Sequence, residues 1–302
     1  MIKRDYTHFA FVVLHYIDFG LTLKSVESIL QLNKDSSSEQ ISIVIVDNNS
    51  PNKSGKLLQE YFKYDKNISV IYMFENKGFA NGNNEGYKHA KKLNPDFIII
   101  ANNDVQFIQK DFLYKIKEIT KEKDVDLFGP NIITADEKHQ NPLRERSLTI
   151  NELRKTIFFQ QVLLVVRKLR KKLAINNKTL IERLSDKKAA NSINITPWKK
   201  KMCGVVLHGA CIIYAKKYIE KEEFAFSPRT FMYGEEDILS LYAKDKGYSM
   251  CYMPILEVLH LEGSSSKSAI KEDLAREVFF TINNIKSKKI LLSMMKDEIK
   301  WP

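Results

Sequence analysis

The sequence predicts an α/β protein with a mostly parallel central sheet flanked by helices. Over the first 130 residues, short apolar runs typical of buried strands alternate with segments of helical spacing. The chain has 302 residues, enough for one large domain or two modest ones. With 44% hydrophobic and 28% charged residues, its composition is typical of a folded protein and excludes disordered, collagen-like and disulfide-dense classes.

The first half supplies the strands of the predicted sheet. Residues 9–14 form a continuous apolar run that suits a strand buried on both faces. The following elements are, in order, a helix over 21–32, a strand over 41–46, a helix over 53–64, a strand over 68–73, a helix ending near 92 and a strand over 96–101. Strands that alternate with helices in this way are connected in parallel.

The second half is more helical. Residues 131–150 read as a loop, and residues 151–185 predict one or two basic amphipathic helices. Strand patterns return over 204–214 and 248–254, with a helix over 236–245 between them and a helical segment over the last forty residues. The expected apolar stripe of the basic helices consists of Leu163, Val166, Leu169 and Leu173, with Arg167, Lys168, Arg170, Lys171 and Lys172 on the other faces.

The positive charge is confined to one segment. Residues 151–201 hold 14 of the 48 Lys and Arg residues and three acids, so this segment accounts for the whole net charge of +11. A protein surface that binds nucleic acid would carry positive charge over a wider part of the chain. A local function of this segment is therefore favoured, such as contact with anionic lipid. The alternative is that the apolar stripe packs on the protein or on a second subunit and that the charges are only solvated.

Cysteine usage and apolar runs predict where the protein is found. Cys203, Cys211 and Cys251 form no CxxC pair, and we expect three reduced, buried thiols and a cytosolic protein. The run over 9–14 lacks a cleavage site, and the run over 157–166 is far shorter than the ~20 residues that span a bilayer. Neither a signal peptide nor a membrane span is predicted.

Two polar clusters follow strands of the first half. Asp47–Ser50 could accept hydrogen bonds from a base or a ribose, although Asx-rich clusters are also ordinary turn formers. Asn76–Gly86 is rich in Gly and Asn, which permits close approach of the backbone to a ligand and suits a phosphate at a helix N-terminus. The segment is neither GxGxxG nor a Walker A loop, and a plain loop is the alternative.

Two further clusters carry carboxylates. Asp104, at the end of Asn102-Asn103-Asp104, suits a hard divalent cation, or it caps a following helix. Glu235, Glu236 and Asp237 are consecutive acids before a predicted helix; one of them could be a general base, or all three could stabilise the helix N-terminus. His260 ends a strand-like run, where it is either a metal ligand or structural.

These segments together resemble the family 2 inverting glycosyltransferases with the GT-A fold, especially the rhamnosyltransferase-like branch of bacterial polysaccharide assembly. The similar segments are 45–50 (IVDNNS), 76–86 (NKGFANGNNEG), 101–105 (ANNDV), 209–211 (GAC), 231–236 (FMYGEE) and Val258-Leu-His260 with Ser264. The resemblance runs from about residue 9 to 265 and breaks over about 135–200.

The resemblance implies a domain organisation. A GT-A, Rossmann-like domain would cover residues 1–265, with a nucleotide-sugar-binding half over 1–130 and an acceptor and catalytic half over 202–265. Residues 140–201 would be a basic helical insertion, and residues 266–302 a C-terminal helical segment.

The resemblance also implies roles for residues. The implied nucleotide-sugar-binding residues are His15, Tyr16, Asp47, Asn49, Asn76, Gly78, Phe79, Asn84, Asn102, Asn103 and Asp104. Asp104 and His260 would hold Mn²⁺ or Mg²⁺, and Gly209, Ala210 and Tyr233 would line the acceptor site. The base falls on Glu236 in the ungapped register, or on Asp237 one residue later, with Glu235 as their neighbour in the catalytic cluster.

The implied reaction moves rhamnose or a hexose from a dTDP- or UDP-sugar to a hydroxyl of a glycan or lipid-linked acceptor. The implied location is the cytoplasm, at the inner face of the cytoplasmic membrane, with possible homo-oligomers and no nucleic-acid partner. Two alternatives are a nucleic-acid-binding α/β protein and a sugar nucleotidyltransferase. The second would carry a Gly-rich, basic triphosphate loop after the first strand, where this chain has His15–Gly20.

Overall fold

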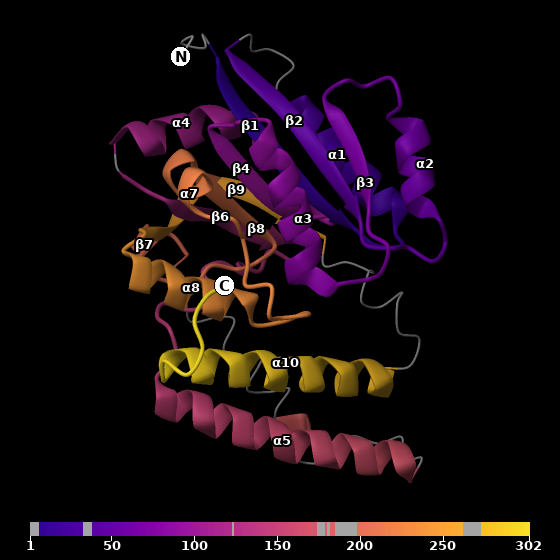
Figure 1. Ribbon diagram of the computed structural model, residues 1–302, viewed down its shortest axis with the longest axis vertical. Helices are drawn as coiled ribbons and strands as arrows, with labels where there is room; N and C mark the ends of the chain where they lie inside the picture. The colour runs from indigo at the N-terminus through magenta and orange to yellow at the C-terminus, as the bar shows by residue number, and fades with distance from the viewer. Residues whose placement is uncertain are drawn as a thin grey trace.

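The structure is a computed structural model that describes residues 6–32, 38–122, 124–173, 179, 182–184, 198–261 and 273–302. One nine-stranded sheet forms its centre, in the order β3-β2-β1-β4-β8-β6-β9-β5, with β7 paired to β9 (Figure 1). The strands are β1 (Thr7–His15), β2 (Glu39–Asp47), β3 (Ile68–Tyr72), β4 (Phe97–Asn102), β5 (Val105–Gln106), β6 (Leu127–Thr134), β7 (Met202–Cys203), β8 (Cys211–Ala215) and β9 (Met250–His260).

Helices cover both faces of this sheet, as predicted. The helices beside it are α1 (Phe19–Gln31), α2 (Ser54–Tyr61), α3 (Gly78–Lys92), α4 (Phe112–Glu122), α7 (Lys216–Lys221) and α8 (Glu235–Lys246). Residues of α1, α2 and α4 share one core with Phe9, Phe11 and Val13 of β1. Residues of α3, α7 and α8 share a second core with Ala10 and Val12. Alternate residues of β1 therefore point to opposite faces, and both are buried, which explains the continuous apolar run.

The sheet is parallel in its first half and mixed in its second. β1 pairs in parallel with β2 and β4, and β2 with β3. β8 runs antiparallel to both β4 and β6, whereas β6 and β9 are parallel. The short strands β5 and β7 each pair antiparallel with β9. The fold class is thus confirmed, and the antiparallel strands belong to the half whose sequence pattern was weaker.

A helical hairpin lies apart from the sheet. α5 (Ile150–Lys172) packs along α10 (Asp273–Met295), and α10 lies between α5 and the sheet (Figure 1). Thr149 and Glu152 begin α5 with a capping box. The predicted apolar stripe is wrong as one face: Leu163 is buried, Val166 is half-buried, and Leu169 and Leu173 are exposed. Among the described residues, no helix is both long and apolar enough to cross a membrane.

The expectation of three reduced thiols is wrong for two cysteines. Cys203 of β7 and Cys251 of β9 are register partners and form a disulfide. Cys211 is buried and free, and burial raises the pKa of its thiol. The pairing could not be predicted from the sequence, because the two cysteines lie 48 residues apart and come together only through the antiparallel pairing of β7 with β9.

Candidate active site

The predicted polar clusters share one edge of the sheet. His15 and Asp47 are register partners at the ends of β1 and β2, and Leu14 pairs with Asn102 at the end of β4. Because these strands are parallel, their carboxyl ends meet at the same edge, where α/β sheets bind ligands.

Asp104 and His260 come together at this edge. β5 pairs with β9 so that Val105 lies opposite His260, and Asp104 Oδ1 is 3.2 Å from His260 Nε2. The two residues are 5% and 8% exposed. His260 Nδ1 lies 2.6 Å from the side-chain oxygen of Gln140, an arrangement that keeps Nε2 directed at Asp104.

A carboxylate and an imidazole this close are a fitting pair for Mn²⁺, and Asp104 alone would suit Mg²⁺. Within the described ranges no group of three His, Cys, Asp or Glu side chains could hold a metal ion. The protein would therefore contribute two ligands, and substrate oxygens and water would supply the others.

His208 stands behind this pair. Its ring centroid is 5.9 Å from that of His260, and its Nδ1 accepts a hydrogen bond from the backbone of Ala210. Burial, with the neighbouring His260, lowers the pKa of His208 to about 4, so the imidazole is neutral at pH 7. Its neutrality avoids placing a further positive charge beside the candidate cation site.

The three consecutive acids lie in three different environments. They begin α8 after Gly234, whose φ of 89° is in the left-handed region. Glu235 is 1% exposed, and burial with the nearby Glu236 raises its pKa to about 8. Asp237 is buried and forms an ion pair with Arg144. Glu236 is only partly buried, which distinguishes it from both neighbours.

Glu236 connects to the Asp104–His260 pair through residues 208–210. A Cβ built on Gly209 would lie 2.6 Å from Glu236 Oε1, so the carboxylate packs directly on this glycine. Desolvation raises the pKa of Glu236, while Arg144 and Lys288 oppose that rise. Burial also lowers the pKa of Lys288, on α10, to about 8. The site therefore holds a carboxylate of raised pKa next to the positive charge of Arg144.

The Gly- and Asn-rich segment packs on the chain just before α8. The backbone N–H of Phe79 donates to the carbonyl of Phe231 at 2.6 Å, and a Cβ on Gly78 would come within 2.0 Å of that oxygen. Two of the predicted clusters, about 150 residues apart, are thus joined at the candidate site.

Several side chains assigned to the nucleotide instead hold the fold. Asn84 is 2% exposed; its amide donates to the carbonyl of Phe226 and accepts from the backbone of Ala225 and Phe226. His15 is fully buried between Thr22 and Ser54, and burial lowers its pKa to about 4.

Asp47 and Asn103 make similar internal contacts. Asp47 accepts a hydrogen bond from the backbone N–H of Ser50, as the turn alternative requires. Asn103 donates from its amide to Thr22 Oγ1. Both side chains are buried.

The remaining predicted residues keep some exposure or present backbone. Asn49 and Asn76 are exposed, and Tyr16, Phe79 and Asn102 are half-buried. Ala210 accepts a hydrogen bond from the backbone of Asn102, beside the buried Gly209. Tyr233 is half-buried, with its ring 4.6 Å from that of Phe280 on α10. Ser264 lies outside the described residues.

The sequence analysis did not predict that Asn48 joins the end of β2 to the residues at the start of α3. Its amide donates to the side chain of Asn76 and to the carbonyl of Gly78, and its oxygen accepts from the backbone of Lys77. Asn48 therefore fixes the start of α3 against the end of β2. The matching signal was present, because Asn48 lies within the segment that resembles the family.

Similarity to solved structures supports the fold. The structure of TarS residues 1–349 from S. aureus matches with a TM-score of 0.52 and 13% identity, over 95% of this chain and 70% of that one. The same protein in complex with UDP matches with a TM-score of 0.53 and 12% identity, over 97% of this chain and 71% of that one. GalNAc-T7 with UDP, GalNAc and Mn²⁺ matches with a TM-score of 0.56 and 11% identity, over 85% of this chain and 43% of that one.

No curated protein matches the chain significantly by sequence. A family model does: "Glycosyl transferase family 2" matches residues 11–183, which is more than half of the chain. That range contains the end of β1 and the whole of β2 and β4, together with Asp104, and the observed fold agrees with the family. The chain therefore belongs to glycosyl transferase family 2 and is a glycosyltransferase.

Proposed function

We propose that this enzyme transfers a sugar from a nucleoside-diphosphate sugar to a hydroxyl group with inversion at the anomeric carbon. The observation that carries the proposal is the joining of Asp104, His260 and Glu236 through residues 208–210 at the carboxyl edge of the sheet. TarS with bound UDP and GalNAc-T7 with bound UDP, GalNAc and Mn²⁺ support a nucleotide-sugar donor.

On the donor side, Asp104 and His260 would hold Mn²⁺ or Mg²⁺. Such a cation stabilises the charge that develops on a diphosphate leaving group. The partly accessible residues Asn49, Asn76 and Asn102 provide amide groups for the nucleotide at the same edge. His15, Asn84 and Asn103 would act indirectly, by holding these segments in place.

On the acceptor side, Glu236 would remove the proton from the attacking hydroxyl. The oxygen then attacks the anomeric carbon opposite the leaving diphosphate; one C–O bond forms, the bond to the diphosphate breaks, and the configuration inverts. Glu236 is the better base because Asp237 is engaged by Arg144 and Glu235 is buried. The raised pKa of Glu236 suits a general base near neutral pH.

The finer assignment rests on the motif resemblance. We propose a dTDP- or UDP-linked rhamnose or hexose as donor and a glycan or lipid-linked acceptor, in the rhamnosyltransferase-like branch that builds bacterial surface polysaccharide such as capsule. The proposed place of work is the inner face of the cytoplasmic membrane.

A thermal-shift screen of UDP- and dTDP-sugars with Mn²⁺ or Mg²⁺ tests the donor site. A donor at 100 times its Kd adds about 2.7 kcal/mol of stability. We expect Asp104→Ala to abolish the metal-dependent part of the shift, whereas Asp111→Ala, at an exposed aspartate just before α4, keeps it. A metal-dependent shift that survives in Asp104→Ala would remove Asp104 from the site.

A further inference from the structure

The outer face of α5 carries an apolar stripe that nothing in the described part of the chain covers. Phe158, Val162, Val165, Leu169 and Leu173 are 69%, 36%, 58%, 51% and 64% exposed. Their spacing of three and four residues places them on one side of the helix. Figure 1 shows α5 as the outermost layer of the molecule, with α10 on its inner side.

Basic side chains border this stripe. Arg154, Lys155, Lys168 and Lys172 are exposed, and none of the four makes an ion pair with a described acid. Glu152, at the first turn, is the single acid in the sequence of α5. The outer face therefore combines apolar area with unneutralised positive charge.

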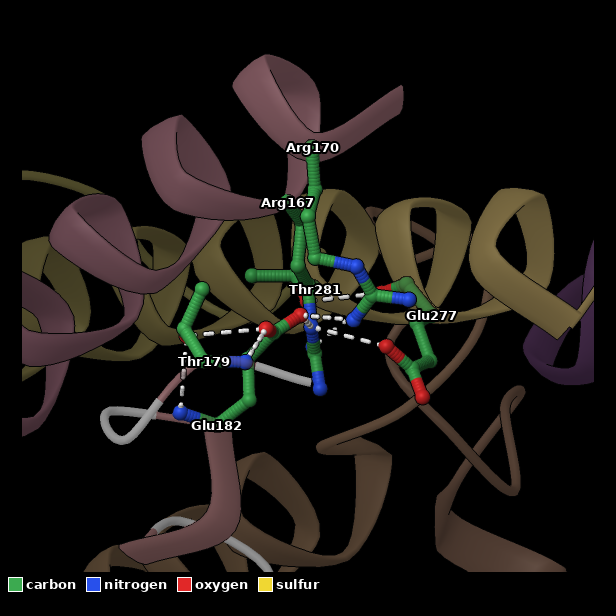
Figure 2. Close-up of polar contacts among 6 residues, drawn as sticks. All are labelled: Arg167, Arg170, Thr179, Glu182, Glu277 and Thr281. Atoms are coloured by element: carbon green, nitrogen blue, oxygen red, sulfur yellow. Dashed lines mark hydrogen bonds and ion pairs between the residues drawn. The ribbon is translucent and has the colours of Figure 1, made fainter. Parts of the chain in front are cut away.

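The other arginines of α5 point inward and fix the rotation of the helix. Arg167 Nε lies 3.3 Å from Glu277 Oε2 on α10, and Arg170 Nη1 donates to Glu182 Oε1 at 2.6 Å (Figure 2). Glu182 is fully buried and also accepts from the backbone and the hydroxyl of Thr179. Rotating α5 about its axis would separate these buried charged groups from their partners, which is strongly unfavourable. The outward direction of the stripe is thus built into the packing.

We infer that α5 lies flat on an anionic lipid bilayer, with its apolar stripe in the boundary between headgroups and acyl chains and its lysines against anionic headgroups. A helix of 23 residues presents about 34 Å of such a face. Apolar area and cationic charge on one helix face are the two contributions that hold interfacial helices on membranes. A second copy of the chain fits less well, because it would bring two sets of unneutralised cations together.

The hairpin would also orient the candidate site. α10 contacts α8 and carries Phe279 and Phe280, whose rings lie 6.1 Å from Phe231 and 4.6 Å from Tyr233, just before the acidic cluster. Docking through α5 would therefore hold the acceptor side one helix layer from the lipid surface. The inference stands on the surface of α5 and does not require the proposed transfer reaction.

Vesicle co-sedimentation of the full chain tests the inference, with vesicles of phosphatidylcholine containing 30% phosphatidylglycerol and vesicles of phosphatidylcholine alone. We expect binding to the anionic vesicles that weakens as salt increases. Lys155→Gln/Lys168→Gln/Lys172→Gln should reduce the affinity about a hundredfold, since each basic residue near such a surface contributes about fivefold. Phe158→Gln/Val165→Gln/Leu169→Gln should reduce it at least tenfold.

The matched control is Lys56→Gln/Lys66→Gln/Lys110→Gln, which removes the same charge from exposed positions elsewhere and should bind nearly as wild type. All substituted side chains are exposed, so the variants should keep the wild-type thermal transition.

The inference is overturned if wild type does not sediment with anionic vesicles, or if both α5 variants bind as tightly as wild type. It is also overturned if wild type does not bind vesicles but forms a dimer that the Phe158→Gln/Val165→Gln/Leu169→Gln variant does not form. In that case a second copy of the chain covers the stripe. Sugar transfer to a soluble acceptor, measured without vesicles, tests the proposed reaction independently of membrane binding.

Discussion

At the scale of single residues, Glu235, Glu236 and Asp237 show how neighbours determine chemistry. All three could serve as base in the sequence, and all three lie in the first turn of α8. Arg144, 93 positions before Asp237, engages one of them, and burial removes another from solvent. These partners come from distant parts of the chain, so the sequence could name the cluster but could not rank its members.

Glu235→Gln should change how stability depends on pH. The folded pKa of about 8 lies above the ordinary value of 4.5, so the folded state binds the proton more tightly than the unfolded state. Wild-type stability contributed by this group is therefore fully present below pH 4.5 and falls as the pH rises towards 8, by at most about 1.4 kcal/mol per pH unit.

Glutamine is neutral throughout, so urea unfolding at pH 5 to 8 should show the variant gaining stability relative to wild type as the pH rises. A stability difference that is constant over this range would contradict the raised pKa.

At the scale of elements, the Gly- and Asn-rich segment is more regular than its composition predicts. The sequence favoured either a phosphate-binding loop or a plain loop, but α3 begins at Gly78 and runs through most of the segment. Asn81 and Asn84 find backbone partners in residues 225–230, which compensates for their weak helix propensity. Local composition could not reveal those partners.

Gly78→Ala should destabilise the protein more than Gly247→Ala. Both glycines have positive φ, 79° and 72°, so alanine is strained by about 1–2 kcal/mol at either position. A Cβ on Gly78 also collides with the Phe231 carbonyl at 2.0 Å, whereas a Cβ on Gly247 meets nothing within 4 Å. Urea unfolding of the two variants measures the difference. Equal losses of stability would show that α3 does not press on the Phe231 segment.

In the hairpin of α5 and α10, too, the local sequence pattern does not reveal partners from other segments. Periodicity predicted the basic helix correctly but assigned its buried face wrongly, because Arg167 and Arg170 lie inside and Leu169 and Leu173 lie outside. An arginine can be buried when acids from another segment pair with it, and Glu182 and Glu277 supply that pairing.

Glu182→Gln should therefore destabilise the hairpin by about 3 kcal/mol, since it removes the charge of a buried acid that pairs with the buried Arg170. Glu152→Gln is the matched control, because Glu152 also caps a helix after a threonine and pairs with an arginine, but on the surface. Thermal unfolding followed by circular dichroism should show a much smaller loss for Glu152→Gln. Equal losses would mean that the buried network contributes no more than a surface ion pair.

At the scale of the whole molecule, the sequence predicted the parallel half of the sheet and much less of the mixed half. Strands β1, β2 and β4 are apolar because both of their faces are covered, and this produces a strong sequence pattern. β6 was not predicted, since Gly129, Pro130 and Asn131 interrupt it and its register with β9 shifts at that point. β5 and β7 have two residues each, too few for any periodic signal.

Residue chemistry alone could predict the separate clusters, but only the motif resemblance predicted that they form one site. Asp104 and His260 meet because β5 pairs with β9, and Gly78 meets Phe231 because α3 packs on the segment before α8. Neither contact follows from spacing along the chain. The assignment of roles to these residues stays a prediction.

The most direct test of the central claim is the rate of nucleoside-diphosphate release from the donor identified by the thermal-shift screen, with acceptor and Mn²⁺ present, for Glu236→Gln and Asp237→Asn. We expect Glu236→Gln to lower turnover by about 10²–10⁴-fold, the usual contribution of a general base, while donor binding stays unchanged. Asp237→Asn should lower turnover less, because it only weakens the ion pair with Arg144. Wild-type turnover in Glu236→Gln would contradict the claim that this carboxylate takes the proton from the acceptor.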